Sequence, residues 1–322
     1  MRALVTGGSG FIGGAVTRTL LAKGTDVRVL LRAGTEPNIP DPAAVEIVHG
    51  DLRDAHAVRA AAEGCAAIFH VGALYSFVAD AAELHEINVG GTRNVIDAAR
   101  VVGARLVHTS SISTIGGMRG GVIPDERQET SGLSPGPYKE SKLQAERLVR
   151  KEVTRDLDAV IVNPTFPIGW GDVKPTPTGA MIRDFLDGKI PAYLDTGMNV
   201  VDVDDVAEGH WLAFVHGQRG ERYILGNANL MMRELLDHLA ELSGRKAPRV
   251  KLPYAVALGL AHAGALVGRS RVPLEGVRTA REIRFASSAR AMRELGLPQT
   301  PVRTALEKAV RWFQQLKQGG RS

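Results

Sequence analysis

Apolar residues in the first half of the chain occur in short runs, and stretches of helical periodicity separate these runs. The runs cover residues 3–5, 27–31, 45–48, 66–71, 105–108 and 159–162. Their near-continuous apolar content is typical of strands that are buried on both faces. Helical patterns over 11–23, 83–102 and 135–153 lie between them. This alternation predicts an α/β fold with a doubly wound parallel sheet and right-handed crossovers.

The pattern changes after residue 168. Residues 170–199 contain several prolines and glycines and are expected to be irregular. A short strand is expected over 200–203, a helix from the capping pair Asp204-Asp205 through Val215, and another strand over 223–225. The remainder, from Met231, is expected to be mainly helical. We therefore expect a second, smaller and mostly helical domain beside the parallel sheet.

Three glycines, Gly7, Gly10 and Gly13, connect the first predicted strand to the first predicted helix. In this context they would allow a tight turn, a close approach to a pyrophosphate, and close packing of helix on strand. Free N–H groups at the helix start would bind the pyrophosphate charge. The Gly-x-x-Gly-x-x-Gly spacing differs from Gly-x-Gly-x-x-Gly, and a simple strand-to-helix turn is the alternative. The context nevertheless favours a Rossmann domain that binds NAD or NADP.

Residues at the ends of later strands could also contact the dinucleotide. Arg32 ends the second strand, 19 residues after Gly13, where an arginine suits the 2′-phosphate of NADP and an acidic residue suits NAD. A solvated loop arginine is the alternative. Asp51 could accept a hydrogen bond from the adenine amino group, or cap the helix that starts near Asp54. Ala73, after the fourth strand, is small enough to let the cofactor pass.

The predicted chemistry depends on Tyr138 and Lys142, which are four residues apart on a helix and therefore share a face. A tyrosine hydroxyl titrates near pH ~10, and a nearby ammonium group favours tyrosinate. Such a tyrosine could exchange a proton with an alcohol or carbonyl while hydride moves to or from the cofactor. Ser111, at the end of the fifth strand, could hydrogen-bond the same substrate oxygen. A solvated helix face is the alternative for Tyr-x-x-x-Lys alone.

Composition narrows the function classes. The chain has 322 residues, 44% hydrophobic and 23% charged, with a net charge of +5. No Lys/Arg-rich run concentrates this charge, so nucleic-acid binding is not favoured. The single cysteine, Cys65, fits a reducing compartment, and no signal peptide precedes the first strand, so we expect a cytoplasmic protein. The apolar run 252–268 is too short for a membrane span and is expected to be a buried or ligand-facing helix.

Other catalytic classes lack their motifs. The histidines are scattered without metal-ligand spacing, so we predict no metal. A Gly-x-Ser-x-Gly elbow is absent, which makes a serine hydrolase improbable. A Gly-Lys-Ser/Thr sequence is absent after the glycine loop, which argues against a nucleoside triphosphatase.

The motifs resemble those of the extended short-chain dehydrogenase/reductases, the NAD-dependent epimerase/dehydratase group, along nearly the whole chain. The resemblance depends on the stretches 6–13, 50–52, 88–95, 109–111, 138–142 and 163–165. More narrowly, the stretches 172–179, 191–197, 271–277 and 293–299 are similar to those of hopanoid-associated sugar epimerases. The chain is also similar, less closely, to dihydroflavonol 4-reductases, whose second strand likewise ends in arginine.

The resemblance implies a role for individual residues. Ser111, Tyr138 and Lys142 would be the catalytic triad. The cofactor-binding residues would be Gly7, Gly10, Phe11, Ile12, Gly13, Arg32, Asp51, Leu52, Ala73, Asn88, Tyr138, Lys142, Pro164 and Ile168. Asn88 would help to position cofactor or water, or would bond a strand carbonyl as a structural residue. Asp202 departs from the family, where an aromatic residue or histidine is common, and this affects the expected fit of the substrate.

The resemblance also implies domains and a partner. Residues 1–168, plus about 199–226, would form the dinucleotide-binding Rossmann domain, and 169–198 and 227–322 the substrate-binding domain. Family members often form homodimers, here through the helices 83–102 and 135–153. The partners would thus be a small-molecule substrate and a second copy of the chain.

The leading hypothesis is hydride transfer between NAD or NADP and a secondary alcohol or ketone. The substrate would be sugar-like or polyol-like, with a hopanoid-linked compound as one option. An epimerase would retain its cofactor, whereas a reductase would exchange NADP(H) at every turnover. The family name favours an epimerase, and Arg32 favours a reductase. A non-catalytic NAD(P)-binding sensor is the third alternative, and such proteins can dispense with the tyrosine.

Overall fold

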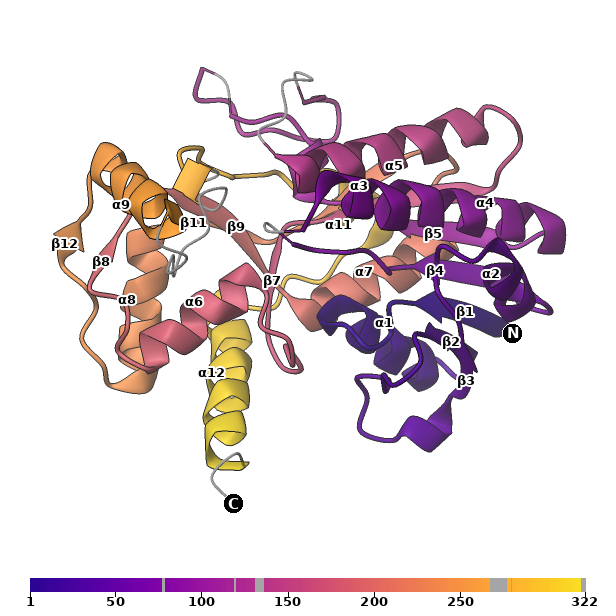
Figure 1. Cartoon of the computed structure of the whole chain (residues 1–322), viewed down its shortest axis with the longest axis horizontal. Coiled ribbons are helices and arrows are strands. Elements are labelled where there is room, and N and C mark those ends of the chain that lie inside the picture. The colour runs from indigo at the N-terminus through magenta and orange to yellow at the C-terminus, as the bar shows by residue number, and fades with distance from the viewer. Residues whose placement is uncertain (77–78, 119, 131–135, 267–276, 279, 320–322) are drawn as a thin grey trace.

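Six strands from residues 2–164 and one later strand, β10, form a parallel sheet of seven strands (Figure 1). The computed structural model describes residues 1–76, 79–118, 120–130, 136–266, 277–278 and 280–319. The strand order is β10-β6-β5-β4-β1-β2-β3, and every pairing is parallel. The strands are β1 Arg2–Thr6, β2 Asp26–Leu31, β3 Glu46–His49, β4 Ala67–His70, β5 Arg105–Thr109, β6 Ala159–Pro164 and β10 Arg222–Leu225. The predicted doubly wound sheet is confirmed.

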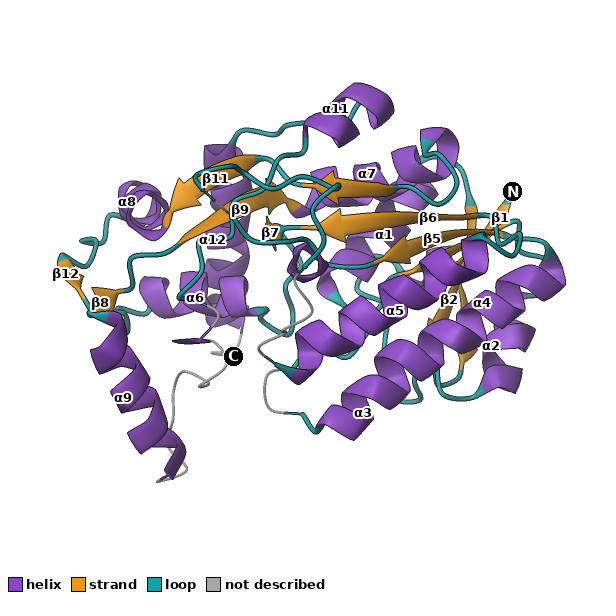
Figure 2. Cartoon of the chain, turned by 90° about the horizontal axis from the view of Figure 1, so that it is seen from above, coloured by secondary structure: helices purple, strands orange, loops and turns teal. Residues whose placement is uncertain are grey.

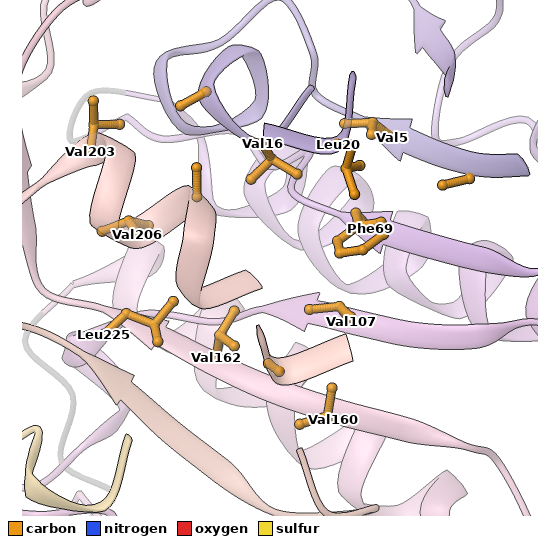
Figure 3. Packing of buried hydrophobic residues seen from close by; sticks show 14 of the residues in the cluster. Val5, Val16, Leu20, Phe69, Val107, Val160, Val162, Val203, Val206 and Leu225 are labelled. Carbon is orange, nitrogen blue, oxygen red and sulfur yellow. The ribbon is translucent and has the colours of Figure 1, made fainter. Parts of the chain in front are cut away.

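Helices cover both faces of this sheet because its strands are apolar on both sides (Figure 2). Leu4, Ile68 and Leu106 face one side, whereas the next residue along each strand belongs to the opposite cluster. The first side is covered by α2 Ala55–Ala62, α4 Gly91–Val102 and α5 Pro137–Val153, and the other by α1 Phe11–Ala22, α7 Val203–His216 and α11 Ala289–Leu295. Figure 3 shows the second cluster, including Val5, Val16, Leu20, Phe69, Val107, Val162 and Val206.

A smaller part of the chain forms its own core after β6. It contains a three-stranded sheet of β11 Ala228–Met231, β9 Gly197–Asp202 and β7 Phe166–Ile168, and a two-stranded sheet of β12 Val250–Lys251 and β8 Ala192–Tyr193. Its helices are α6 Pro177–Leu186, α8 Met232–Ser243, α9 Tyr254–Leu266 and α12 Val302–Gly319. Helices α6, α8 and α12 bury a separate apolar cluster against the small sheet. The mainly helical character expected after Met231 is confirmed.

Two predictions for this region are wrong. Residues 170–199 are not irregular, because α6, β8 and the start of β9 lie within them. Their short elements are stabilised by contacts with α8 and α12, which a local pattern cannot reveal. The capping residue of α7 is Asp202, whose carboxylate accepts a hydrogen bond from the Asp204 N–H at 2.9 Å, rather than the pair Asp204-Asp205.

The long helix predicted over 83–102 is divided in the structure. It consists of α3 Ala81–His85, a π-helical turn over Glu86–Gly90 and α4. A π-turn inserts an extra residue and is often found at functional sites. The predicted start of the next helix, Pro135, lies outside the described residues, and α5 begins at Pro137. Short 3₁₀ turns occur at Pro42–Ala44 and Ile112–Thr114.

Candidate active site

A cavity of about 1640 Å³ extends from the carboxyl ends of the parallel strands to the C-terminal helices. Its lining combines the glycine loop after β1, the strand ends of β2 to β6, and residues of α5, α6, α8 and α9. Pockets for single drug-sized ligands are typically about 300–1,000 Å³. The cavity therefore has room for a dinucleotide and a second molecule at the edge of the sheet where α/β proteins bind ligands.

The glycine loop fits a pyrophosphate group. Gly7 has φ of +77°, and a Cβ there would lie 2.6 Å from the Gly72 Cα. A Cβ at Gly13 would lie 2.1 Å from the Gly7 carbonyl oxygen. Gly10 precedes the first turn of α1, which contains no acidic residue. The loop thus presents the helix N-terminus to the cavity without a side chain in the way, as phosphate binding at a helix start requires.

The predicted adenosine-binding residues Arg32, Asp51, Leu52 and Ala73 all line the cavity. Arg32 is exposed at the end of β2 and close enough to Asp51 to contribute to lowering its pKa. The main cause of that lowered pKa is Arg53, whose Nε donates to the Asp51 carboxylate at 2.9 Å. The cap of α2 is not Asp51 but the next acidic residue, Asp54. Asp51 is therefore positioned in the cavity, and the helix-capping alternative for it is wrong.

Ser111, Tyr138 and Lys142 converge on the same part of the cavity. Tyr138 lies in the first turn of α5, and its hydroxyl forms a hydrogen bond with the Ser111 side chain. The Lys142 Nζ, one turn later, donates to the Thr109 carbonyl at 2.7 Å. The Tyr75 ring lies 4.6 Å from the Tyr138 ring, between centroids. The strand end of β5 and one face of α5 thus assemble the three groups, as their sequence spacing indicated.

Burial controls the proton affinities of these groups. It raises the pKa of the Tyr138 hydroxyl, and Tyr75 raises this pKa further, whereas the hydrogen bond with Ser111 lowers it. Burial lowers the pKa of Lys142 to about 8, and the carboxylate of Glu146 opposes this effect. Tyr138 is therefore protonated and Lys142 mostly cationic at neutral pH. A protonated tyrosine beside a cation is suited to donating a proton to a substrate oxygen.

A buried polar cluster that the sequence did not predict lies beneath the triad. The carboxylate of Glu146 accepts hydrogen bonds from Thr114 Oγ1 at 2.7 Å, Asn163 Nδ2 at 2.9 Å and Arg222 Nη1 at 2.9 Å. Ser110, which precedes Ser111, also donates to it. Glu146 follows Lys142 by four residues, so its place on the same stripe of α5 was a usable signal.

Two residues assigned to the cofactor do not line the cavity. Asn88 is buried in the π-turn, where its Oδ1 accepts from the Leu74 N–H at 2.7 Å and its Nδ2 donates to the Leu74 carbonyl at 3.1 Å. This matches the structural alternative, because Asn88 fixes the loop after β4 rather than facing the cavity. Ile168 is 2% exposed and packs in the core of the smaller part of the chain. Its neighbour Pro164 does line the cavity.

The end of the cavity remote from the glycine loop is largely apolar. It is lined by Met181, Leu194, Met198, Met232, Leu236, Leu252, Ala257, Leu260, Ala261 and Val277. Leu252 and the α9 residues Ala257, Leu260 and Ala261 belong to this wall, so part of the apolar run 252–268 faces the cavity; residues 267–268 lie outside the described residues. The polar lining residues near this region include Lys139, Arg183, Lys189, Glu282 and Arg284.

Two further features concern the described residues as a whole. None of their groups of three or more His, Cys, Asp or Glu side chains is arranged to hold a metal ion. Among their helices, none combines the length and the apolar character that crossing a membrane requires.

Comparisons with known proteins agree with this geometry. The model of the NAD dependent epimerase/dehydratase family matches residues 3–226. A Synechocystis protein whose name provisionally assigns it to the dihydroflavonol 4-reductases is 41% identical, over 96% of this chain and 94% of its own length. Sterol demethylase protein B of Methylococcus capsulatus is 35% identical, over 98% of this chain and 99% of its own length. The structure of Thermus thermophilus UDP-glucose 4-epimerase with NAD is 25% identical and superposes with a TM-score of 0.78, covering 98% of this chain and 99% of that one.

Proposed function

Because this chain belongs to the NAD-dependent epimerase/dehydratase family and is an NAD(P)-dependent enzyme, we propose that it transfers hydride between a nicotinamide and a secondary alcohol or ketone. One observation carries the proposal. Ser111, Tyr138 and Lys142 line the cavity between the glycine loop and the apolar end, where a nicotinamide and a substrate would meet. A sensor without turnover would not need these three groups together.

Each residue of the triad has a distinct task. The cofactor supplies or accepts the hydride when it is bound. Tyr138 donates a proton to the substrate oxygen during reduction, and accepts it during oxidation. Ser111 hydrogen-bonds the Tyr138 hydroxyl in the structure and would turn its single O–H to the same substrate oxygen when the substrate binds. Lys142 places its positive charge near Tyr138 and thereby favours the tyrosinate that remains after proton transfer.

We propose NADP as the preferred cofactor because Arg32 directly follows β2 and lines the cavity where the adenosine ribose would lie. Replacing Arg32→Gln should weaken NADPH binding on the order of tenfold while changing NADH binding little, because a charge-assisted hydrogen bond to phosphate is lost. Fluorescence titration of both cofactors measures this. Arg59→Gln, at an exposed position on α2, is the control. Equal losses for NADPH and NADH would contradict the assignment.

The apolar end of the cavity supports a substrate whose reacting carbon is attached to a large hydrophobic body, of which a hopanoid side chain would be one example. A sugar ring needs many polar partners, whereas the lining from α8 and α9 consists of Met232, Leu236, Ala257, Leu260 and Ala261. Polar residues of the lining, such as Thr178 and Asp184, come from α6. The sterol-related name of one relative is consistent with this class. Replacing Ala261→Trp should raise KM for a bulky terpenoid ketone more than for a small ketone. Equal effects on both ketones would favour a polar, sugar-like substrate.

The Tyr138→Phe variant tests the catalytic assignment. It should lose nearly all turnover and retain cofactor binding, because only the proton-transferring oxygen is removed. Tyr254→Phe, which changes a tyrosine of α9 outside the triad, is the matched control. Steady-state rates and cofactor titration are measured on both variants. Unchanged turnover by Tyr138→Phe would refute the assignment.

The cofactor content of the purified protein separates the two possible cycles. Release of about one equivalent of NAD on denaturation would favour an epimerase, which retains its cofactor through the cycle. A protein that is purified without a bound cofactor and binds NADPH more tightly than NADH would favour a reductase of the dihydroflavonol reductase type. The apolar cavity and Arg32 together favour the reductase.

We also propose that the enzyme is a cytoplasmic homodimer and that residues 169–198 and 227–322 supply most substrate contacts. Helices α4 and α5 lie side by side on one face of the sheet, where the second copy would pack (Figure 2). Light scattering after size-exclusion chromatography tests the dimer, and a monomer would contradict it.

A further inference from the structure

Arg284 is fixed at the wall of the cavity by the main chain around it. Its N–H donates to the Gly197 carbonyl at 2.7 Å, and its own carbonyl accepts from the Asn199 N–H at 3.0 Å. These bonds attach the segment to β9 opposite Met198. Arg284 belongs to the lining of the same cavity as Tyr138 and Lys139, so its side chain, which is 10% exposed, borders a molecule bound there.

The guanidinium group of Arg284 is only partly paired. Its side chain is 10% exposed, and its Nη2 forms one ion pair, with the Glu282 carboxylate at 2.8 Å. Among the described residues, its buried Nε has no hydrogen-bond partner. A guanidinium has five N–H donors, and a buried donor without an acceptor is costly. The side chain therefore has capacity for a second acceptor, such as an oxygen of a bound substrate.

Lys139 adds a second positive charge to this place. It follows Tyr138 directly in the sequence and lines the cavity. Burial lowers the pKa of Lys139, and the nearby Arg284 lowers it further. Two cations thus face one carboxylate, that of Glu282, which is about half exposed. The three groups leave a local excess of one positive charge, which a monoanion would balance.

We propose that Arg284 and Lys139 bind a carboxylate of the substrate that lies a few bonds from the reacting carbon. The inference rests on the proposed hydride transfer at Tyr138 and deepens it by naming the substrate class. That class is a 3-oxo acid, or the corresponding 3-hydroxy acid, with a large apolar body. The ketone oxygen faces Tyr138, the carboxylate faces Arg284, and the body lies along α9.

A carboxylate fits better than the diphosphate of a nucleotide sugar. Two other basic residues of the cavity wall are already ion-paired, Arg183 with Asp184 at 3.0 Å and Lys189 with Asp187 at 2.7 Å, whereas Lys174 of the same lining is exposed to solvent. A diphosphate carries more charge than the single positive charge left over at Arg284. The apolar wall beyond it suits a hydrocarbon rather than a nucleotide.

The first experiment compares two ketones that differ only in the carboxylate, 3-oxotetradecanoate and 2-tridecanone. The wild-type enzyme with NADPH should show a higher kcat/KM for the acid, on the order of ten- to a hundredfold, mainly through KM. The Arg284→Gln variant should lose most of this preference, and Arg284→Lys should restore part of it. The exposed neighbour Arg281→Gln is the control and should keep the wild-type ratio. Equal kcat/KM for both ketones, or an unchanged ratio in Arg284→Gln, would overturn the proposal.

A second experiment does not require turnover. Calorimetric titration of tetradecanoate and of tetradecanol into the NADP-loaded enzyme should show tighter binding of the acid, and Arg284→Gln should remove the difference. If neither ketone is reduced but this difference is found, the hydride-transfer proposal fails and the carboxylate site stands. Equal binding of acid and alcohol would refute the carboxylate site. Competition by UDP-glucose that depends on Arg284 would also refute it, in favour of a nucleotide sugar.

Discussion

Acidification should destabilise this protein through histidines that are buried in the neutral form, and His210 allows the effect to be measured at one site. Its Nδ1 lies 2.7 Å from the Val206 carbonyl oxygen, and its Nε2 lies 2.9 Å from Thr109 Oγ1. The residue is fully buried, and burial lowers its pKa to about 4. His70 behaves in the same way, with a pKa lowered to about 3.

The direction in which stability changes with pH follows from proton uptake by the two states. An unfolded histidine binds a proton below pH ~6.5, whereas native His210 does so only near pH 4. Stability is therefore lost as the pH falls from 6.5 towards 4. Between pH 7 and pH 5 the unfolded state gains a proton over about 1.5 pH units, at about 1.4 kcal/mol per unit. His210 alone should thus lower the free energy of unfolding by about 2 kcal/mol over this range.

The His210→Asn variant tests this magnitude. An asparagine can still hydrogen-bond the Val206 carbonyl but does not titrate. The variant should be less stable at pH 7, yet its free energy of unfolding should fall by about 2 kcal/mol less than that of the wild type between pH 7 and pH 5. Urea unfolding followed by circular dichroism at both pH values measures the difference. Parallel pH dependences for variant and wild type would refute the reasoning.

Asp172 provides a control of opposite sign. Its carboxylate accepts hydrogen bonds from Thr176, but burial dominates and raises its pKa to about 6. The stability that it contributes is present at low pH and is lost as the pH rises through 6. Acidification from pH 7 to pH 5 should therefore raise the contribution of Asp172 to the free energy of unfolding by about 1.4 kcal/mol. The Asp172→Asn variant should consequently lose stability on acidification more steeply than the wild type.

Two other predictions concern the glycine loop and the buried polar cluster. Gly13→Ala should weaken cofactor binding at least about tenfold, because its Cβ would lie 2.1 Å from a carbonyl oxygen of the loop and the loop must shift. Gly90→Ala, whose Cβ would meet no atom within 4 Å, should bind the cofactor normally in the same fluorescence titration. Glu146→Gln should lower the free energy of unfolding by about 3–5 kcal/mol, because it breaks a buried ion pair. Glu241→Gln breaks an exposed pair and should cost less than about 1 kcal/mol in urea unfolding; equal losses would contradict this distinction.

The parts of the fold that were predictable have local physical causes. Strands buried on both faces must be apolar throughout, so runs such as 27–31 can be recognised as strands from the sequence. The glycines of the loop are required where the structure has a positive φ at Gly7 and a close contact at Gly13. Tyr138 and Lys142 share a helix face by their spacing alone. The sheet, the dinucleotide loop and the candidate triad therefore followed from the sequence.

The predictions that failed concern residues whose state depends on distant partners. The elements within 170–199 are held by α8 and α12, which lie far along the chain. The sequence pattern predicted the cap of α7 at Asp204-Asp205, and only the backbone path places Asp202 at the N-cap position. Asn88 had two interpretations from the sequence, and its hydrogen bonds with Leu74, a residue of the loop after β4, match the structural one.

The sequence by itself determined the parallel sheet and the glycine loop and predicted the candidate triad, because these depend on short-range spacing and on burial patterns. The tertiary structure alone decided the shape of the substrate end. There, β9 holds Arg284 near Lys139, although 145 residues separate the two in the chain. Such a pairing leaves no periodic trace in the sequence, since chain folding rather than local geometry brings its members together.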